Sequence, residues 1–97
     1  MDVKEMRFSE ILDDVVAGKK ATRLDWKSKG MFIYYVPPRT LTVSKYHMKE
    51  TVTDHERLTN TVNESGYMVL YDENDVRVLG WTPSQTDLVS DEWELLK

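Results

Sequence analysis

The run Met31–Val36 limits the fold more than any other segment. Its residues are aromatic, β-branched or otherwise apolar, and Pro37 and Pro38 end it because proline cannot donate to a β-ladder. Both faces of this expected strand are apolar, so a further layer must cover each of them. A helix of the same chain can cover one face. Another subunit is a candidate for the second, because a chain of 97 residues supplies only one core.

An amphipathic helix is expected near the amino terminus. Its apolar residues follow the spacing i, i+3, i+4, i+7, i+8, which places them on one side of a helix. They are Phe8, Ile11, Leu12, Val15 and Val16. Gly18 follows at the position where glycine commonly ends a helix.

Five segments are expected to form strands because of their β-branched and aromatic content. They are Lys20–Leu24, Met31–Val36, Tyr67–Tyr71, Val76–Leu79 and Trp93–Leu96. The four residues 72–75 between the third and fourth of these are turn formers, which predicts a hairpin. A helix of about two turns is expected after Ser84, because Ser84 and Asp87 have capping-box spacing.

The predicted fold class is α+β. We expect a small single domain over residues 1–97, with a mainly antiparallel sheet of about four or five strands, an N-terminal amphipathic helix and a short C-terminal helix. Asp25–Gly30 is expected to be a loop. The apolar residues of Thr40–Glu64 fit neither the helical nor the strand period, so only a short helix near Ser44–Glu50 is predicted there, followed by irregular structure.

The composition indicates the cellular compartment. The chain has no cysteine, which excludes disulfides, thiolate nucleophiles and cysteine-bound metal centres and suits a reducing cytosol. Its apolar runs are too short to cross a bilayer, and its first residues lack an apolar signal region. A soluble cytoplasmic protein without a membrane partner is therefore expected.

Charge is unevenly distributed along the chain. The formal net charge is −4, which argues against DNA as a partner because proteins that track phosphates carry a basic face. Residues 19–29 nevertheless carry five Lys and Arg residues against Asp25 alone. A short basic segment that contains a tryptophan suits a small phosphorylated ligand, and the alternative is a solvated charged loop.

Patterns for catalysis and metal binding are weak. No Gly-x-Ser-x-Gly turn accompanies the serines, and a helix cap explains Ser84 better. His47 and His55 lack the spacing of a metal-binding helix, and the Gly-Lys-Lys run at residues 18–20 follows a helix where a phosphate loop would precede one. No catalytic residue, metal or cofactor is therefore expected.

Aromatic and cationic residues are the remaining candidates for a site. Arg23, Trp26, Lys29 and Phe32 are close in sequence, and flat rings with cations are what a base and its phosphates require. The alternative role for a tryptophan is to fill a small core. Trp26 differs from the other tryptophans because the residues around it are polar, which predicts a loop over a site.

Together these residues resemble a known family. The matching blocks are Phe8, Ile11-Leu12, Gly18-Lys19-Lys20, Arg23, Trp26, Lys29-Gly30-Met31-Phe32, Val36-Pro37, Trp81, Ser84-Gln85-Thr86-Asp87-Leu88 and Asp91-Glu92-Trp93. In order and spacing they resemble the phage-encoded Thoeris anti-defence 2 family. The resemblance implies a non-enzymatic homotetramer in the host cytoplasm that sequesters the cyclic ADP-ribose isomer made by bacterial TIR-domain enzymes. The Thoeris effector is then not activated. Some relatives also bind cyclic di- or trinucleotides.

The residues of the matching blocks define an expected ligand site. Adenine would stack on Trp26 or Phe32, and Arg23 and Lys29 would hold phosphates. The other residues expected at this site are Trp81, Ser84, Gln85, Thr86 and Asp87. The last four would present side chains and helix-start N–H groups to ribose or phosphate.

Two other functions fit the sequence. An enzyme that cleaves a cyclic nucleotide would need a base, a nucleophile or a metal. A structural or protein-interaction module would instead use the tryptophans at an interface. Stabilisation by a nucleotide separates these functions, because a protein gains stability only from a ligand that binds its native state.

Overall fold

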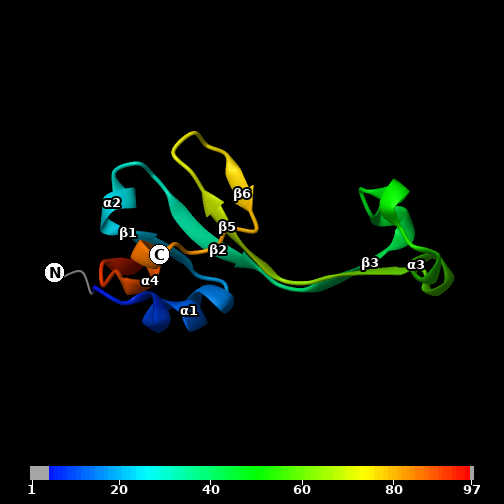
Figure 1. Cartoon of the computed structure of the whole chain (residues 1–97), viewed down its shortest axis with the longest axis horizontal. Helices are drawn as coiled ribbons and strands as arrows, with labels where there is room; N and C mark the ends of the chain where they lie inside the picture. The colour runs from blue at the N-terminus through cyan, green and yellow to red at the C-terminus, as the bar shows by residue number, and fades with distance from the viewer. Residues whose placement is uncertain (1–4, 97) are drawn as a thin grey trace. The chain divides into compact units, whose positions relative to one another are not determined.

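The computed structural model describes residues 5–96 of the chain (Figure 1). These residues belong to two compact units. The first unit is formed by the described residues up to Val36 together with those from Tyr67 onward, and the second by Pro37–Gly66. None of the helices in residues 5–96 is long and apolar enough to cross a membrane.

The first unit is built on a five-stranded antiparallel sheet with the strand order β6-β5-β2-β1-β7. Its strands are β1 (Lys20–Arg23), β2 (Phe32–Val36), β5 (Tyr67–Tyr71), β6 (Arg77–Leu79) and β7 (Trp93–Leu96). Each expected strand is present to within one residue at either end, and β5 and β6 form the predicted hairpin. The expected α+β class with a mainly antiparallel sheet is therefore confirmed.

The registers assign side chains to the two faces of this sheet. Ile33 on β2 lies opposite Ala21 on β1 and Leu70 on β5, and these residues contribute to one hydrophobic core. Because side chains alternate along a strand, Phe32 and Tyr71, which lie opposite each other, belong to the other face. We call the face of Ile33 the core face and the face of Phe32 the far face.

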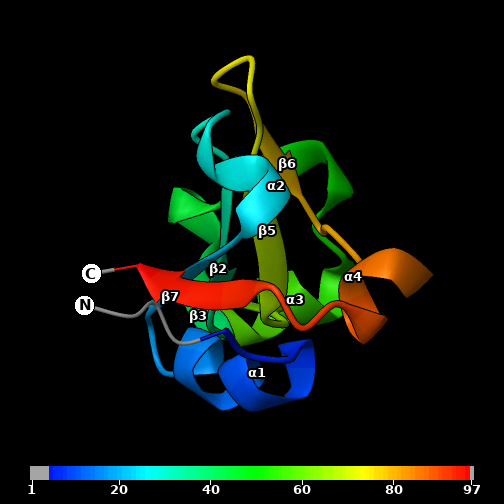
Figure 2. The same ribbon diagram turned by 90° about the vertical axis from the view of Figure 1, so that its left-hand side faces the viewer.

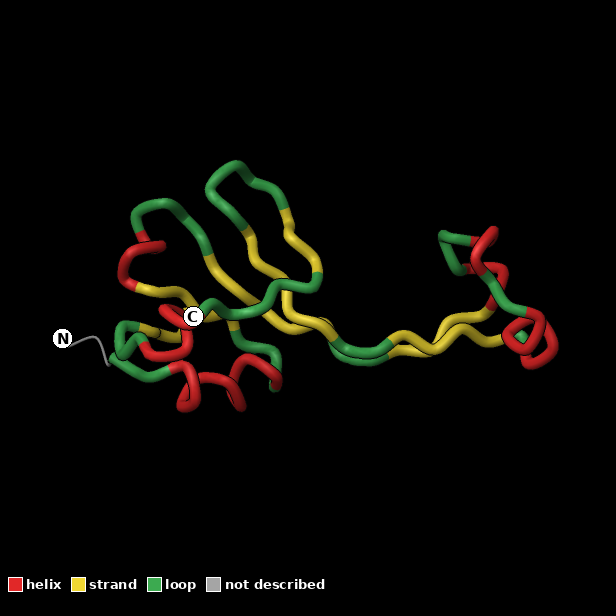
Figure 3. The backbone as a smooth tube through the Cα atoms, in the orientation of Figure 1, coloured by secondary structure: helices red, strands yellow, loops and turns green. Residues whose placement is uncertain are grey.

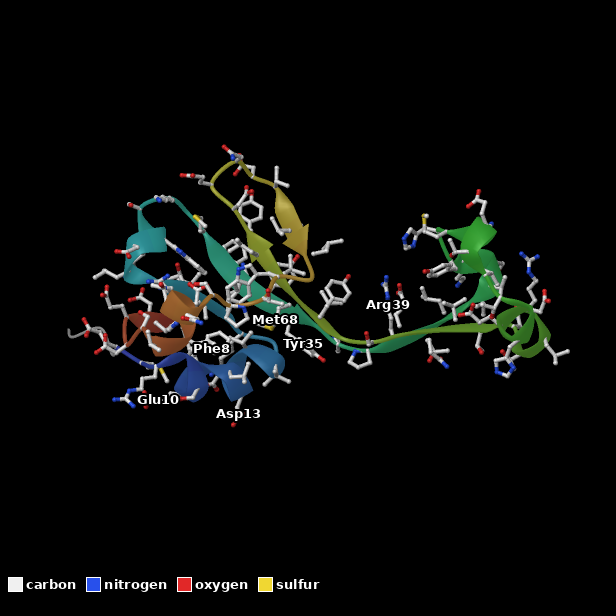
Figure 4. The ribbon with its side chains drawn as sticks, in the orientation of Figure 1. Phe8, Glu10, Asp13, Tyr35, Arg39 and Met68 are labelled. Atoms are coloured by element: carbon white, nitrogen blue, oxygen red, sulfur yellow. The ribbon has the colours of Figure 1, made fainter. Side chains whose placement is uncertain are left out.

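Helix α1 (Phe8–Val16) covers the core face. Phe8, Ile11 and Val15 are buried, and they form the core with Ala21, Ile33 and Trp93. Figure 2 shows α1 beside β7, and Figure 4 shows Phe8 directed toward the sheet while Asp13 points away from it. The predicted helix is confirmed, but its apolar side was predicted too wide: Leu12 and Val16 are 37% and 50% exposed.

Helix α1 ends as its sequence predicts. The chain continues through Ala17 to Gly18, whose φ of +113° lies in a region that favours glycine. β1 then begins two residues later.

Two short helices complete the first unit. Helix α4 (Gln85–Val89) begins at the predicted capping box. Helix α2 (Leu24–Lys27) replaces part of the expected loop Asp25–Gly30, so that prediction was wrong for its first half. The amide of Leu24 donates to the carbonyl of Glu92 at 3.1 Å, which joins the start of α2 to the residue before β7.

The second unit is a hairpin with three helical segments between its strands. Strands β3 (Arg39–Thr42) and β4 (Thr61–Glu64) pair with Arg39 opposite Glu64, and the two side chains form an ion pair at 2.8 Å. Figure 3 shows these strands in yellow and the helical segments in red, and Figure 4 labels Arg39. Val52 and Val62 are the buried apolar residues of this unit.

The predicted helix near Ser44–Glu50 was wrong. The segment forms two separate 3-10 turns, η1 (Val43–Lys45) and η2 (Lys49–Thr51). Helix α3 (Asp54–Thr59) follows where irregular structure was expected. A capping box between Thr53 and Glu56 begins α3, and this signal was present in the sequence but overlooked.

Candidate functional site

Three tryptophans from distant parts of the chain meet at the core face. The ring centroid of Trp26 lies 5.1 Å from that of Trp93 and 6.0 Å from that of Trp81, edge-on at 83° and 82°. Phe8 lies edge-on to Trp93 at 5.3 Å. Such edge-to-face pairs add to the stabilisation from burial. We call Trp26, Trp81 and Trp93 with Phe8 the tryptophan cluster.

The members of the tryptophan cluster differ in burial. Trp93 is fully buried, whereas Trp26 and Trp81 are partly exposed. Trp26 therefore does not stand on a loop without apolar neighbours, as its sequence context predicted, but packs against the core from α2. The carbonyl of Trp26 accepts from the amides of Lys29 and Met31, which closes the turn after α2.

Trp81 is held by the end of the β5–β6 hairpin. Its amide and that of Gly80 both donate to the carbonyl of Met68, at 3.0 and 2.9 Å. Gly80 has a φ of +76°, a conformation that permits the change of direction after β6. No local sequence pattern indicates this attachment, because it joins residues that are far apart along the chain.

Arg23, the last residue of β1, contacts both the cluster and α4. Its Nη1 donates to Oδ1 of Asp87 at 2.7 Å, and the carbon of its guanidinium lies 5.6 Å from the centroid of Trp26. Nη2 lies 3.7 Å from Asp25. The side chain is only 11% exposed, and among the described residues nothing accepts a hydrogen bond from its buried Nε.

Asp87 joins several elements at the start of α4. Its Oδ2 accepts from the amide of Ser84 at 2.8 Å, while the hydroxyl oxygen of Ser84 accepts from the amide of Asp87 at 3.1 Å, which confirms the capping box. The indole N–H of Trp93 donates to the carbonyl of Asp87 at 2.8 Å. Both carboxylate oxygens of this buried residue therefore have partners within the fold.

The other residues expected at the site are distributed differently. Lys29 is exposed after α2, and Gln85 and Thr86 are exposed in the first turn of α4. Phe32 is not part of the tryptophan cluster, because it lies on the far face. The structure thus brings Arg23, Trp26, Trp81, Ser84 and Asp87 together and separates Phe32 from them.

The far face carries a second group of rings and cations. Phe32 stacks on Tyr71 with a centroid distance of 5.0 Å and an interplanar angle of 16°. The guanidinium of Arg77 lies 5.5 Å from the centroid of Tyr34 and 5.3 Å from that of Tyr71, and Lys20 Nζ lies 4.9 Å from that of Phe32. We call these five residues the tyrosine cluster.

Polar contacts tie the tyrosine cluster together. Arg77 Nη1 donates to the hydroxyl oxygen of Tyr34 at 2.7 Å, and the hydroxyl of Tyr71 donates to Asp75 at 3.0 Å. The hydrogen bond to Asp75 raises the pKa of Tyr71 above its ordinary value of 10.0. Tyr34, Tyr71 and Arg77 were missed from sequence. Strand alternation groups Tyr34 with Phe32, but only the pairing of Phe32 with Tyr71 places the two tyrosine rings on one face.

The histidines lie in the second unit. The ring of His47 is 5.0 Å from that of Tyr46, and His55 belongs to α3. Within residues 5–96, no group of three or more His, Asp and Glu residues is arranged to hold a metal ion.

The fold and these two clusters define a small α+β protein whose sheet carries aromatic and cationic residues on both faces. A family model, the Thoeris anti-defense 2-like domain, matches residues 6–96. The chain therefore belongs to the Thoeris anti-defense 2-like family, as its sequence blocks predicted, and its role is Thoeris anti-defence. No curated protein matches the chain.

Proposed function

We propose that this protein sequesters the cyclic ADP-ribose isomer made by bacterial TIR-domain enzymes and releases it chemically unchanged. The observation that carries the proposal is the tryptophan cluster, in which two partly exposed rings, Trp26 and Trp81, lie beside a basic segment in a member of an anti-defence family. Such a ligand combines an adenine with a pyrophosphate, so it requires both aromatic faces and cations.

The ligand site would be formed on the α2 side of the tryptophan cluster. Adenine would stack on Trp26 or Trp81, because Phe32 faces the other side of the sheet. Exposed Lys29 would attract the phosphates. The exposed residues at the start of α4, Gln85 and Thr86, would contact ribose or phosphate beside Ser84.

The strength of binding would come mainly from burial. Nanomolar affinity corresponds to about −12 kcal/mol, whereas an exposed ion pair contributes roughly 0 to 1 kcal/mol. Stacking of a base on an aromatic ring contributes about 1 to 3 kcal/mol. A sponge that relies on Trp26 and Trp81 therefore needs its ligand enclosed, with only a few cations for the phosphates.

Oligomerisation would supply part of that enclosure. We propose a homo-oligomer, a tetramer by the family resemblance, acting in the cytoplasm of the infected cell. The rings of Phe32, Tyr34 and Tyr71 are partly exposed on the far face of this chain, and a second subunit would cover them. Obligate interfaces of this kind resemble a divided core.

The test is to recover the bound molecule. The purified protein is mixed with the TIR-derived cyclic ADP-ribose isomer, freed of unbound ligand, denatured by heat, and the released material is separated by chromatography. Intact ligand in a fixed ratio to protein supports sequestration. A linear or cleaved product indicates an enzyme, and absence of retained ligand contradicts the proposal.

A matched pair of variants locates the site in the same experiment. Trp26→Ala removes a ring of the tryptophan cluster, and Phe32→Leu removes a ring of the tyrosine cluster. The proposal predicts less retained ligand for Trp26→Ala than for Phe32→Leu, with circular dichroism confirming that both variants fold.

A further inference from the structure

The most buried ionic contact in the described residues joins Arg23 to Asp87. The two side chains are 11% and 8% exposed, and Nη1 lies 2.7 Å from Oδ1. The pair connects residues 64 positions apart in sequence, from the end of β1 to the first turn of α4. Its position next to Trp26 makes it part of the tryptophan cluster's immediate surroundings.

The geometry leaves little of either side chain for a ligand. A phosphate could reach Arg23 only through the 11% of its side chain that is exposed, and Nη1 is already bound to Asp87. Each carboxylate oxygen of Asp87 already accepts a hydrogen bond, Oδ1 from Arg23 and Oδ2 from the amide of Ser84, and only 8% of this side chain is exposed to a ribose hydroxyl. Direct ligand contacts from these two residues would therefore require the side chains to become more exposed than they are in this structure.

The same contacts fix the rings. Arg23 lies against one side of Trp26. Asp87, which binds Arg23 through its side chain, also accepts the indole hydrogen bond of Trp93 through its backbone carbonyl. Trp93 in turn lies edge-on to Trp26. A chain of contacts thus runs from Asp87 through both Arg23 and Trp93 to the Trp26 ring.

We propose that Arg23 and Asp87 are positioning residues that set the orientation of Trp26, and that they do not bind the phosphates or ribose themselves. This inference rests on the proposed ligand site, but the orientation of Trp26 exists without ligand. Arg23 faces two carboxylates, Asp87 at 2.7 Å and Asp25 at 3.7 Å, so its charge is already balanced and attraction of an anionic ligand falls to exposed cations such as Lys29.

The test uses a neutral replacement of the pair. In Arg23→Gln with Asp87→Asn, the two new amides can hydrogen-bond to each other, and the new amide at position 87 can still accept from the backbone N–H of Ser84. Either single variant instead leaves one buried charge without its buried, oppositely charged partner, which is strongly destabilising. The matched control is the exposed pair Lys19 and Asp14, which lies 3.8 Å apart on the first unit.

Two readouts are compared: the near-ultraviolet circular dichroism of the coupled tryptophans without ligand, and retention of the cyclic ADP-ribose isomer. We expect each single variant to weaken the tryptophan signal and retain roughly tenfold less ligand, and the double variant to return within about threefold of the original protein. Asp14→Asn alone, which breaks this exposed pair without removing a cation of the basic segment, should change neither readout.

Three results would overturn the inference. The first is a double variant that recovers the tryptophan signal but retains as little ligand as Arg23→Gln, because Arg23 would then bind ligand directly. The second is single variants with an unchanged tryptophan signal. If the single variants do not fold, Arg23→Lys replaces them, because it keeps the charge but not the guanidinium geometry. The third result that would overturn the inference is an unchanged tryptophan signal together with unchanged ligand retention in Arg23→Lys.

If the proposed function is wrong, the two readouts separate. In that case the original protein retains no ligand, while the tryptophan signal of the ligand-free variants still reports whether Arg23 and Asp87 orient the ring.

Discussion

The two faces of one sheet carry the same kinds of residue in different surroundings. On the core face, the guanidinium of Arg23 is buried beside Trp26 and bound to the carboxylate of Asp87. On the far face, Arg77 is exposed and lies over Tyr34 and Tyr71. An arginine next to an aromatic ring therefore has two distinct roles in this protein.

The difference lies in what water can reach. A buried ion pair cannot lose one partner without leaving an unsolvated charge, so it fixes the elements that carry it. An exposed cation over a ring exchanges its contact for water at little cost, and salt screens it. The core face is accordingly expected to be rigid and the far face adaptable.

The largest effect is expected for Asp87→Ala. The change leaves Arg23 without its buried partner, with only the exposed Asp25 at 3.7 Å, and removes the acceptor of the Ser84 amide. The free energy of unfolding should fall by about 3 to 5 kcal/mol, measured by urea denaturation. Asp14→Ala, which removes an exposed partner of Lys19, is the control, and equal losses in both variants would contradict the account.

The next effect concerns the ring proposed to bind the base. Trp26→Ala should weaken binding of the cyclic ADP-ribose isomer by about 1 to 3 kcal/mol, the range for loss of a stacking ring, measured by titration calorimetry. Phe32→Leu on the far face should change the affinity less. If the two variants lose the same affinity, the ligand does not distinguish the faces.

A smaller effect is expected for Arg77→Gln. The variant loses a cation over two exposed rings and the hydrogen bond to Tyr34. Its free energy of unfolding should fall by about 0.5 to 1 kcal/mol at low salt, and by less at high salt. A loss as large as that of Asp87→Ala would show that the far face is as constrained as the core face.

The smallest expected change is a titration on the far face. The hydrogen bond from Tyr71 to Asp75 raises the pKa of Tyr71 above 10.0, so the folded state holds this proton more tightly than the unfolded chain does. The contribution to stability is present below pH 10 and is lost as the pH rises through the folded-state pKa. In Asp75→Asn the ultraviolet titration of Tyr71 should shift to lower pH. An unchanged titration would exclude Asp75 as the cause.

Elements with local signals were predictable from sequence. The apolar spacing before Gly18 predicted α1, the turn formers at residues 72–75 predicted the β5–β6 hairpin, and Ser84 with Asp87 predicted the start of α4. Each of these signals involves residues within a few positions of one another. The second unit was missed because its hairpin strands are separated by residues 43–60, a segment without a clear period.

The site depends on contacts that no local pattern contains. The sequence indicated Arg23, Trp26, Ser84 and Asp87 as site residues, but it could not pair Arg23 with Asp87 across 64 positions. Polar neighbours also suggested that Trp26 stands on an exposed loop, whereas rings from other elements pack against it. The position of Phe32 on the face opposite Ile33 could have been predicted from the sequence, because side chains alternate along a strand.

A crystal structure of the protein with the cyclic ADP-ribose isomer tests the central claim most directly, because it locates the ligand on one face or the other. We predict intact ligand with its adenine stacked on Trp26 or Trp81 and with the Arg23–Asp87 pair unbroken. Ligand stacked on Phe32 or Tyr71, or a cleaved product in either place, would contradict the account.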